Sequence, residues 1–217
     1  MSNERKEVVM STKARKTCLA IITEQILKWL YSEGNISEIE YLKAKLGIES
    51  ILLNISKFFI IYACAIRFQT LIPTVITHLA YVSLRKFSQG LHAKSSLVCT
   101  IVSLFMFVAI PYMAQDVIIN RWLIFLAFVV STYLFWKYAP ADTEKSPILG
   151  VKNRLELKLY TIGINVLLMY VALTLIMPMF RTLITIGMLM QVIMVLPITY
   201  KILGRSYKNY EKYETED

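Results

Sequence analysis

The chain has 217 residues, of which 56% are hydrophobic and 18% are charged, and its mean hydropathy is +0.53. Soluble domains are roughly 45–50% apolar and about 25% charged, so this composition excludes an ordinary soluble globular protein, and the 7 Gly and 6 Pro exclude collagen-like and low-complexity chains. The 24 Lys and Arg against 15 Asp and Glu give a net charge of +9, which on so apolar a chain indicates an anionic membrane surface before a nucleic acid.

The first 47 residues are the most polar part of the chain and predict helices at the membrane surface. From Leu19 to Leu30, apolar residues recur at helical spacing with charged residues between them. This pattern is typical of an amphipathic helix that lies in the interface or packs on the cytoplasmic face of its own protein. Gly34 is expected to end it, and Ser37 with Glu40 resembles the capping box of a second, short helix.

Six apolar stretches follow, and each is predicted to cross the membrane as a helix, since a spanning helix needs about 20 mostly apolar residues. They are residues 50–66, 68–84, 96–114, 122–136, 159–180 and 182–200. The predicted fold class is therefore all-α: a polytopic membrane bundle of about six transmembrane helices preceded by an N-terminal amphipathic helix. We expect three parts, namely cytoplasmic or interfacial helices over 1–47, a transmembrane domain over 48–200 and a cytoplasmic tail over 201–217.

The basic residues predict the orientation, because cytoplasmic segments of membrane proteins are enriched in Lys and Arg. With the N-terminus inside, the inner segments 1–47, 85–95, 137–158 and 201–217 hold 20 of the 24 basic residues. The outer loops hold only Arg67, Arg121 and Arg181. Both termini are therefore expected in the cytoplasm.

The segment between the second and third predicted spans carries the strongest candidates for chemistry, His92 and Cys99. A cysteine nucleophile needs a base, and histidine is the usual one. Seven residues of straight helix rise about 10.5 Å, which is too far for a hydrogen bond. Gly90 permits a turn, and Ser95 or Ser96 can cap the next helix, so His92 can fold back over Cys99 in or just past the first helical turn.

The residues alone leave other interpretations open. Cys99 is as compatible with a small packing residue as Cys18 and Cys64 are, and His78 is either functional or a satisfied structural histidine. Polar Asn54 and Lys57 inside a span allow a small transporter or exporter without peptidase activity, and a noncatalytic membrane sensor is also possible. The chain has no Gly-rich phosphate loop, HExxH or GxSxG motif. We expect no cofactor, no metal and no nucleic-acid partner.

Three segments resemble the accessory gene regulator protein B (AgrB) family. The motif Arg85-Lys86-x-x-x-Gly90-x-His92-Ala93-x-Ser95-x-x-x-Cys99 is similar to that family's active-site segment. The loop Ala139–Thr143, followed by Lys145–Ile148, and the stretch Tyr41–Lys57 resemble the family as well. Gln89 departs from the pattern, since many relatives have a second glycine there, and we expect a stiffer loop.

The resemblance implies a membrane-embedded cysteine endopeptidase of the bacterial cell membrane, with its active site at the cytoplasmic face. Its substrate would be a short amphipathic pro-peptide of quorum sensing, from which it removes an acidic C-terminal tail. An acyl-enzyme thioester would then close into a thiolactone or lactone autoinducer. The resemblance makes Cys99 the nucleophile and His92 the general base and later acid.

The same resemblance gives a set of substrate-binding or supporting residues. They are Arg85, Lys86, Gly90, Ser95 and Glu49. The basic side chains of the predicted cytoplasmic segments are expected to attract the acidic tail of the pro-peptide. The expected partners are the pro-peptide, anionic lipid and a second copy of the chain in a homodimer.

Overall fold

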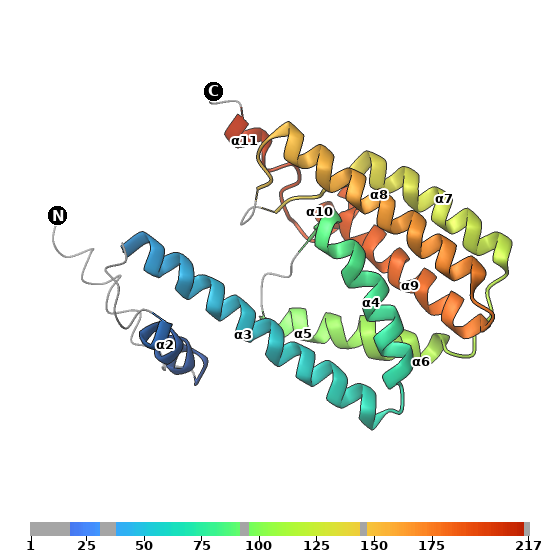
Figure 1. The fold of residues 1–217 in the computed structure, drawn as a ribbon, viewed down its shortest axis with the longest axis horizontal. Helices are drawn as coiled ribbons and strands as arrows, with labels where there is room; N and C mark the ends of the chain where they lie inside the picture. Colours follow the sequence, from blue (N-terminus) through green and yellow to red (C-terminus); the bar gives the residue numbers. More distant parts are fainter. Residues whose placement is uncertain (1–17, 31–37, 92–95, 144–146, 215–217) are drawn as a thin grey trace. The chain divides into compact units, whose positions relative to one another are not determined.

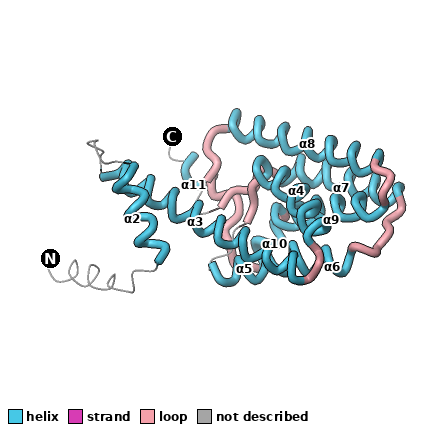
Figure 2. Tube along the Cα trace, turned by 60° about the horizontal axis from the view of Figure 1, so that its bottom comes forward, coloured by secondary structure: helices cyan, strands magenta, loops and turns pink. Residues whose placement is uncertain are grey.

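The fold is built from helices (Figure 2). The computed structural model describes residues 18–30, 38–91, 96–143 and 147–214, and among these residues it has no strand. In chain order the elements are α2 (Cys18–Leu30), α3 (Glu38–Arg67), α4 (Leu71–Ser88), α5 (Ser96–Leu104), the π-helical segment η1 (Phe105–Ala109), α6 (Ile110–Ala114), α7 (Arg121–Tyr138), α8 (Val151–Thr174), α9 (Pro178–Val195), α10 (Pro197–Ile202) and α11 (Glu211–Glu214). The all-α prediction is confirmed.

The chain divides into two units, residues 1–60 and 61–217, and each is described by itself. In the first unit, α2 lies where the amphipathic helix was predicted and ends at Leu30. The prediction of a separate short helix after Ser37 was wrong, because α3 runs unbroken from Glu38 through the first predicted span. Gly47 lies within it with open space around its Cα, and a single glycine costs a helix only about 1 kcal/mol.

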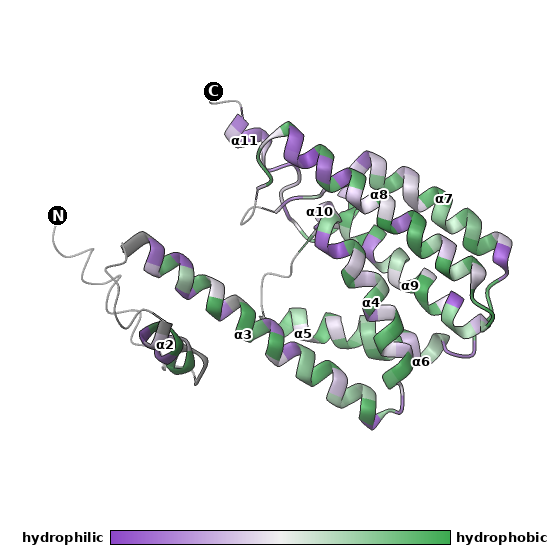
Figure 3. Cartoon of the chain, viewed as in Figure 1, coloured by the Kyte–Doolittle hydropathy of each residue, from purple (hydrophilic) through white to green (hydrophobic). Residues whose placement is uncertain are grey.

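Four helical segments of the described chain are long and apolar enough to cross a membrane: Glu40–Arg67, Leu97–Ala114, Val151–Thr174 and Pro178–Val195. The other two predicted spans coincide with α4 and α7, which are 18-residue helices with basic residues in their last turns. Many large apolar residues are exposed, among them Trp122, Val166 and Ile193, and hydrophobic residues run along most of the helices (Figure 3). The protein is therefore a helical membrane protein.

The core of the second unit lies where α4, α7, α8 and α9 pack side by side (Figure 1). The tightest approach is between α4 and α9 at Gly187. A Cβ there would lie 2.5 Å from the Thr77 carbonyl oxygen and 2.9 Å from the Ala80 Cβ. In lipid there is little hydrophobic driving force for helices to associate. Small residues let the helix backbones approach closely, and the resulting van der Waals packing stabilises the contact.

A buried amide joins α7 to α8. The Asn165 Nδ2 donates to Thr132 Oγ1 at 2.9 Å, and Ser131 Oγ donates to Asn165 Oδ1 at 3.2 Å. Hydrogen-bonding groups among apolar side chains are satisfied at only one register, so this cluster fixes how the two helices align.

The segment α5–η1–α6 is one continuous helix with a π-helical insertion in its middle, and the insertion packs on α4. The Phe107 ring centre lies 4.4 Å from that of His78 and 5.0 Å from that of Tyr81. His78 Nδ1 is also 3.1 Å from the Tyr62 hydroxyl in a hydrogen bond. These contacts fit the structural alternative for His78. Single-turn π insertions are frequent at functional sites.

We expect Gly187→Ala to destabilise the protein by about 1–3 kcal/mol, because its methyl group must push the α4 backbone away. The matched control is Gly163→Ala on α8, where nothing lies within 4 Å of the added Cβ. The control should be neutral or stabilising by up to about 1 kcal/mol. Thermal unfolding of the detergent-solubilised variants checks this, and equal midpoints for the two variants would contradict the packing.

Candidate functional site

Cys99 lies in α5, whose first residue is Ser96, so the thiol is at the end of the first helical turn as predicted. It is half-buried and forms no disulfide. At this end of a helix the first backbone N–H groups have no intrahelical acceptor and the dipole favours negative charge. His92 and Ser95, the other two key positions of this segment, lie outside the described residues, so the His92–Cys99 contact stays a prediction.

The backbone that leads to His92 is clamped by Arg85. Its Nη1 donates to the Gln89 carbonyl at 3.0 Å, and its Nη2 donates to the carbonyls of Gly90 and Leu91 at 3.0 and 2.6 Å. These carbonyls follow the last turn of α4, where the helix no longer supplies donors, and Gln89 also accepts from Gln191. A guanidinium can serve all three because its N–H groups form a rigid planar fork. Arg85 therefore positions the loop, and its direct contact with substrate stays a prediction.

The turn itself depends on two residues with positive φ. Gly90 has φ +114°, and a Cβ there would lie 2.7 Å from the Met194 carbonyl oxygen and 2.8 Å from Arg85 Nη1. Gln89 has φ +55° and ψ −134°, a conformation that glycine adopts without steric penalty. The backbone thus explains why Gly90 is needed here, and it shows that position 89 also has a conformation suited to glycine.

The loop Ala139–Asp142 binds this turn from the other side. The Gly90 N–H donates to the Ala141 carbonyl at 2.7 Å, and the Ala141 N–H donates to the Ser88 carbonyl at 3.0 Å. Gln89 and Ala141 form an isolated parallel bridge. Two segments that resemble one family are therefore joined directly through their backbones, although about 50 residues separate them in sequence.

Buried polar side chains complete the attachment. Gln191 of α9 donates through Nε2 to Ser88 Oγ and to the Gln89 carbonyl, both at 2.6 Å. The Asp142 carboxylate accepts from the backbone N–H groups of Asn209 and Tyr210 at 2.9 and 2.8 Å. The Tyr200 hydroxyl donates to the Asp142 carbonyl at 2.9 Å. The site-forming loops are thereby held to α9 and to the C-terminal segment.

Sequence reasoning did not identify Gln191, Asp142 or Tyr200 as parts of the site. A signal was present for Gln191, which is an amide inside a predicted span, where polar side chains mark functional or structural contacts. Asp142 lay within a segment that the family resemblance had already singled out. Tyr200 gave no signal, because its partner is a backbone carbonyl 58 residues away.

Lys86 and Glu49 are the remaining predicted site residues in the described part of the chain. Lys86 is exposed, with its Nζ 5.3 Å from the Phe87 ring centre. Glu49 is half-buried on α3 in the first unit and is described only there.

The two turn residues should respond oppositely to substitution. Gly90→Ala should destabilise by about 1–3 kcal/mol, because both the positive φ and the Met194 carbonyl oppose a Cβ. Gln89→Gly should be neutral or stabilising by up to about 1 kcal/mol, since relief of the left-handed penalty outweighs the entropy of glycine. Unfolding midpoints measured in detergent test the pair, and a Gly90→Ala protein as stable as wild type would refute the turn.

The C-terminal helix α11 is expected to detach in acid. The Arg154 guanidinium and then the Gly150 N–H hold the pKa of the Glu214 carboxyl below its usual value. A depressed pKa means that the contact contributes above the unfolded pKa of about 4.3 and is lost as the pH falls through the lower folded value. In the wild-type protein, the backbone amides of residues 209–214 should be protected from hydrogen exchange at neutral pH.

Glu214→Gln should lower that protection at neutral pH, and the difference from wild type should vanish near pH 3 after correction for intrinsic exchange. Glu156→Gln, which removes an exposed carboxyl from α8, is the control and should change nothing. Equal protection in wild type and Glu214→Gln at neutral pH would show that the ion pair does not hold α11.

Comparison with known proteins supports the family resemblance of the sequence. A family model described as accessory gene regulator B matches residues 23–195. The chain is 44% identical over 174 residues to a putative AgrB-like protein of Listeria monocytogenes serotype 4a, which covers 80% of this chain and 85% of that one. It is 40% identical over 196 residues to a putative AgrB-like protein of Clostridium acetobutylicum, covering 89% and 91%.

The accessory gene regulator protein B of Staphylococcus haemolyticus is 32% identical over 177 residues, which are 82% of this chain and 93% of that protein. No solved structure matches the chain. The match over most of the chain, with its helical membrane fold, shows that the protein belongs to the accessory gene regulator B family.

Proposed function

We propose that the protein is a membrane cysteine endopeptidase that removes the acidic C-terminal tail of a short quorum-sensing pro-peptide and promotes closure of the remaining peptide into a ring. The observation that carries this proposal is Cys99, a half-buried thiol in the first turn of α5. It stands a few residues beyond a loop that Arg85 and Ala141 clamp on both sides. Such an arrangement supports a nucleophile whose base is brought in by the intervening segment.

The proposed reaction has two acyl-transfer steps. His92 takes the proton of the Cys99 thiol, and the sulfur attacks the scissile carbonyl carbon. The peptide C–N bond then breaks, the tail leaves with its new amine protonated by His92, and the peptide remains as a thioester on Cys99. A thiol or hydroxyl within the peptide attacks that thioester, which forms the ring and returns the thiol of Cys99.

The clamp has a role in this scheme as a positioning device. Effective catalysis needs reacting groups held near attack geometry, and small misplacements lower the rate strongly. The carbonyls of residues 89–91 are fixed by Arg85 and Gln191, so the chain enters residue 92 from a defined point. The half-buried setting of Cys99 also limits the water that competes with ring closure.

The cytoplasmic face is the proposed location of the site. The basic residues are concentrated in segments 1–47, 85–95, 137–158 and 201–217, and the positive-inside rule assigns such segments to the cytoplasm. The second of these segments leads directly to Cys99. A homodimer and contacts with anionic lipid are further parts of the proposal.

Cys99→Ala should abolish tail removal, and His92→Ala should slow it by about 10²–10⁴-fold, the usual contribution of a general base. The assay co-expresses each variant with the pro-peptide and measures the released tail and the ring by mass spectrometry. Cys64→Ala is the matched control, because Cys64 is also an undisulfided, half-buried cysteine of the helical bundle. It should retain activity.

Cys99 should also react faster with a thiol probe near neutral pH than Cys64. Tail removal at the wild-type rate by Cys99→Ala would end the peptidase proposal. A variant set in which Asn54, Lys57 or His78 is essential and Cys99 is dispensable would instead favour the transporter.

A further inference from the structure

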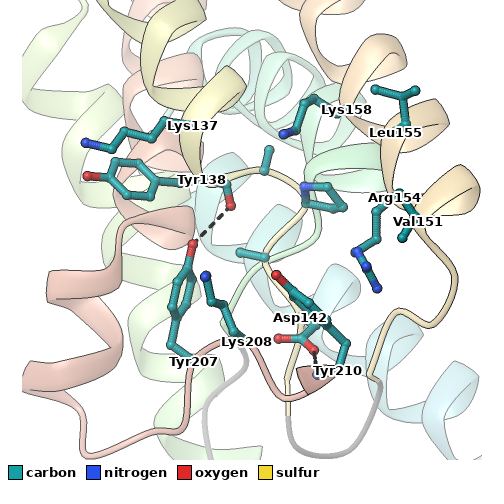
Figure 4. A pocket seen from close by; sticks show the side chains of 13 residues that line it. Lys137, Tyr138, Asp142, Val151, Arg154, Leu155, Lys158, Tyr207, Lys208 and Tyr210 are labelled. Carbon is teal, nitrogen blue, oxygen red and sulfur yellow. Dashed lines mark hydrogen bonds between the residues drawn. The ribbon is translucent and has the colours of Figure 1, made fainter. Parts of the chain in front are cut away.

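A basic pocket lies beside the clamped loop (Figure 4). It has a volume of about 210 Å³ and is bounded by the end of α7, the start of α8 and the segment between α10 and α11. The backbone of residues 139–142 passes through its wall. Its charged lining residues among those described are Lys137, Arg154, Lys158 and Lys208 and the acidic Asp142.

The carboxylates of Asp142, Glu211 and Glu214 offset part, but not all, of the charge of the pocket's four basic residues. The Asp142 carboxylate is occupied by the N–H groups of Asn209 and Tyr210. Within the described part of the chain, Lys137 and Lys158 have no carboxylate partner and instead contact aromatic rings, with Lys158 Nζ 5.4 Å from the Trp136 ring centre. Lys208 pairs with Glu211 only through an exposed contact of 3.0 Å, which a competing carboxylate can displace at little cost.

One side of the pocket already binds a peptide carboxylate. Arg154 holds Glu214 of the chain's own helix α11 through two hydrogen bonds, and the Gly150 N–H adds a third at 3.0 Å. The guanidinium also lies over the Tyr210 ring, 4.0 Å from its centre. A fork of this kind with an aromatic support is suited to the carboxylates of an acidic peptide.

The volume and position narrow the occupant further. A cavity of about 210 Å³ has room for single side chains of a peptide that lies across its opening. Ala141 lines the pocket and is also hydrogen-bonded to Ser88 and Gly90. A segment bound here is therefore one backbone pairing away from the turn that leads to the proposed nucleophile.

We propose that this pocket binds the acidic tail of the peptide substrate, with carboxylates at Lys158 and Lys208 beside the Arg154–Glu214 pair. The inference rests on the proposed function for the identity of the peptide. Figure 4 shows Lys158, Lys208 and Arg154 among the side chains that line the pocket. An anionic lipid headgroup offers similar charge. Arg154, however, already binds a carboxylate of this chain, that of Glu214, which favours the peptide.

The test measures binding without cleavage. The Cys99→Ala protein, full-length and in nonionic detergent, is titrated into a fluorescent synthetic peptide that ends in a run of Glu and Asp. Lys158→Gln with Lys208→Gln should weaken the fluorescence-anisotropy affinity by about tenfold or more, since each lost contact is a charge-assisted hydrogen bond. Lys158→Arg with Lys208→Arg keeps the charge and should keep the affinity within about threefold.

The matched control is Lys152→Gln with Lys201→Gln, which removes two exposed lysines from α8 and α10 outside the pocket. It should weaken binding less than about twofold. A peptide with Asn and Gln in place of the acids should bind all variants weakly. If the control weakened binding as much as Lys158→Gln with Lys208→Gln, the attraction would be general and not local to the pocket. If Lys158→Gln with Lys208→Gln kept wild-type affinity, the tail would bind elsewhere. Either result overturns the inference.

A second measurement tests whether an anionic lipid occupies the pocket in place of the peptide. Retention of phosphatidylglycerol during purification is compared between the variants, and loss of this lipid by the pocket pair with unchanged peptide affinity would make the pocket a lipid site. Unfolding midpoints show whether each pair is folded. Failure here leaves the Cys99 cleavage assay untouched, whereas cleavage by Cys99→Ala would refute the peptidase without any change in peptide binding.

Discussion

The guanidinium of Arg85 is the interaction on which the site depends. It satisfies three successive carbonyls at the end of α4, where the helix can no longer supply donors. Without it, the carbonyls of Gly90 and Leu91 would lose this donor next to the apolar bundle, at about 1–3 kcal/mol each, while Gln89 would keep its bond from Gln191. The clamp lets the chain leave α4 in a defined direction, pair with Ala141 and continue toward Cys99. A charge that looks available for substrate is thus engaged by the fold.

Buried polar groups hold the elements around this turn in register. Gln191 ties α9 to the turn, and Asn165 ties α8 to α7. Asp142 ties the loop after α7 to the C-terminal segment. Burial raises the pKa of Tyr207 to about 12, so its hydroxyl stays protonated and donates to the Tyr138 carbonyl at 3.4 Å. In an apolar bundle these contacts carry the specificity, because apolar packing alone permits neighbouring registers.

The pocket and the clamp share one piece of backbone, residues 139–142, and this connects binding to chemistry in the proposed mechanism. One side of the loop pairs with the turn before the nucleophile, and the other side forms the wall of a basic cavity. A peptide whose tail occupied the cavity would be held next to the clamped turn, which reduces the entropy lost in reaching the attack geometry. The proposed specificity for acidic tails and the proposed positioning of the thiol would then be properties of the same loop.

The sequence alone determined the helical membrane class, the amphipathic α2, the position of Cys99 in the first turn of its helix and the family, because periodicity, apolar length and motif spacing are local properties. Its capping pattern at Ser37 and Glu40 agrees with the start of α3 at Glu38, but the expected short helix was wrong, because α3 continues past Gly47 through the first predicted span to Arg67. Only the tertiary structure decided that Arg85 caps backbone carbonyls, that Gln191 and Ala141 meet the turn and that Lys158 and Lys208 share a cavity. Arg85 reaches carbonyls only four to six positions away, whereas the partners of the turn on Ala141 and Gln191 are about 50 and 100 positions away. No local pattern encodes which donor will reach which acceptor once the helices have packed.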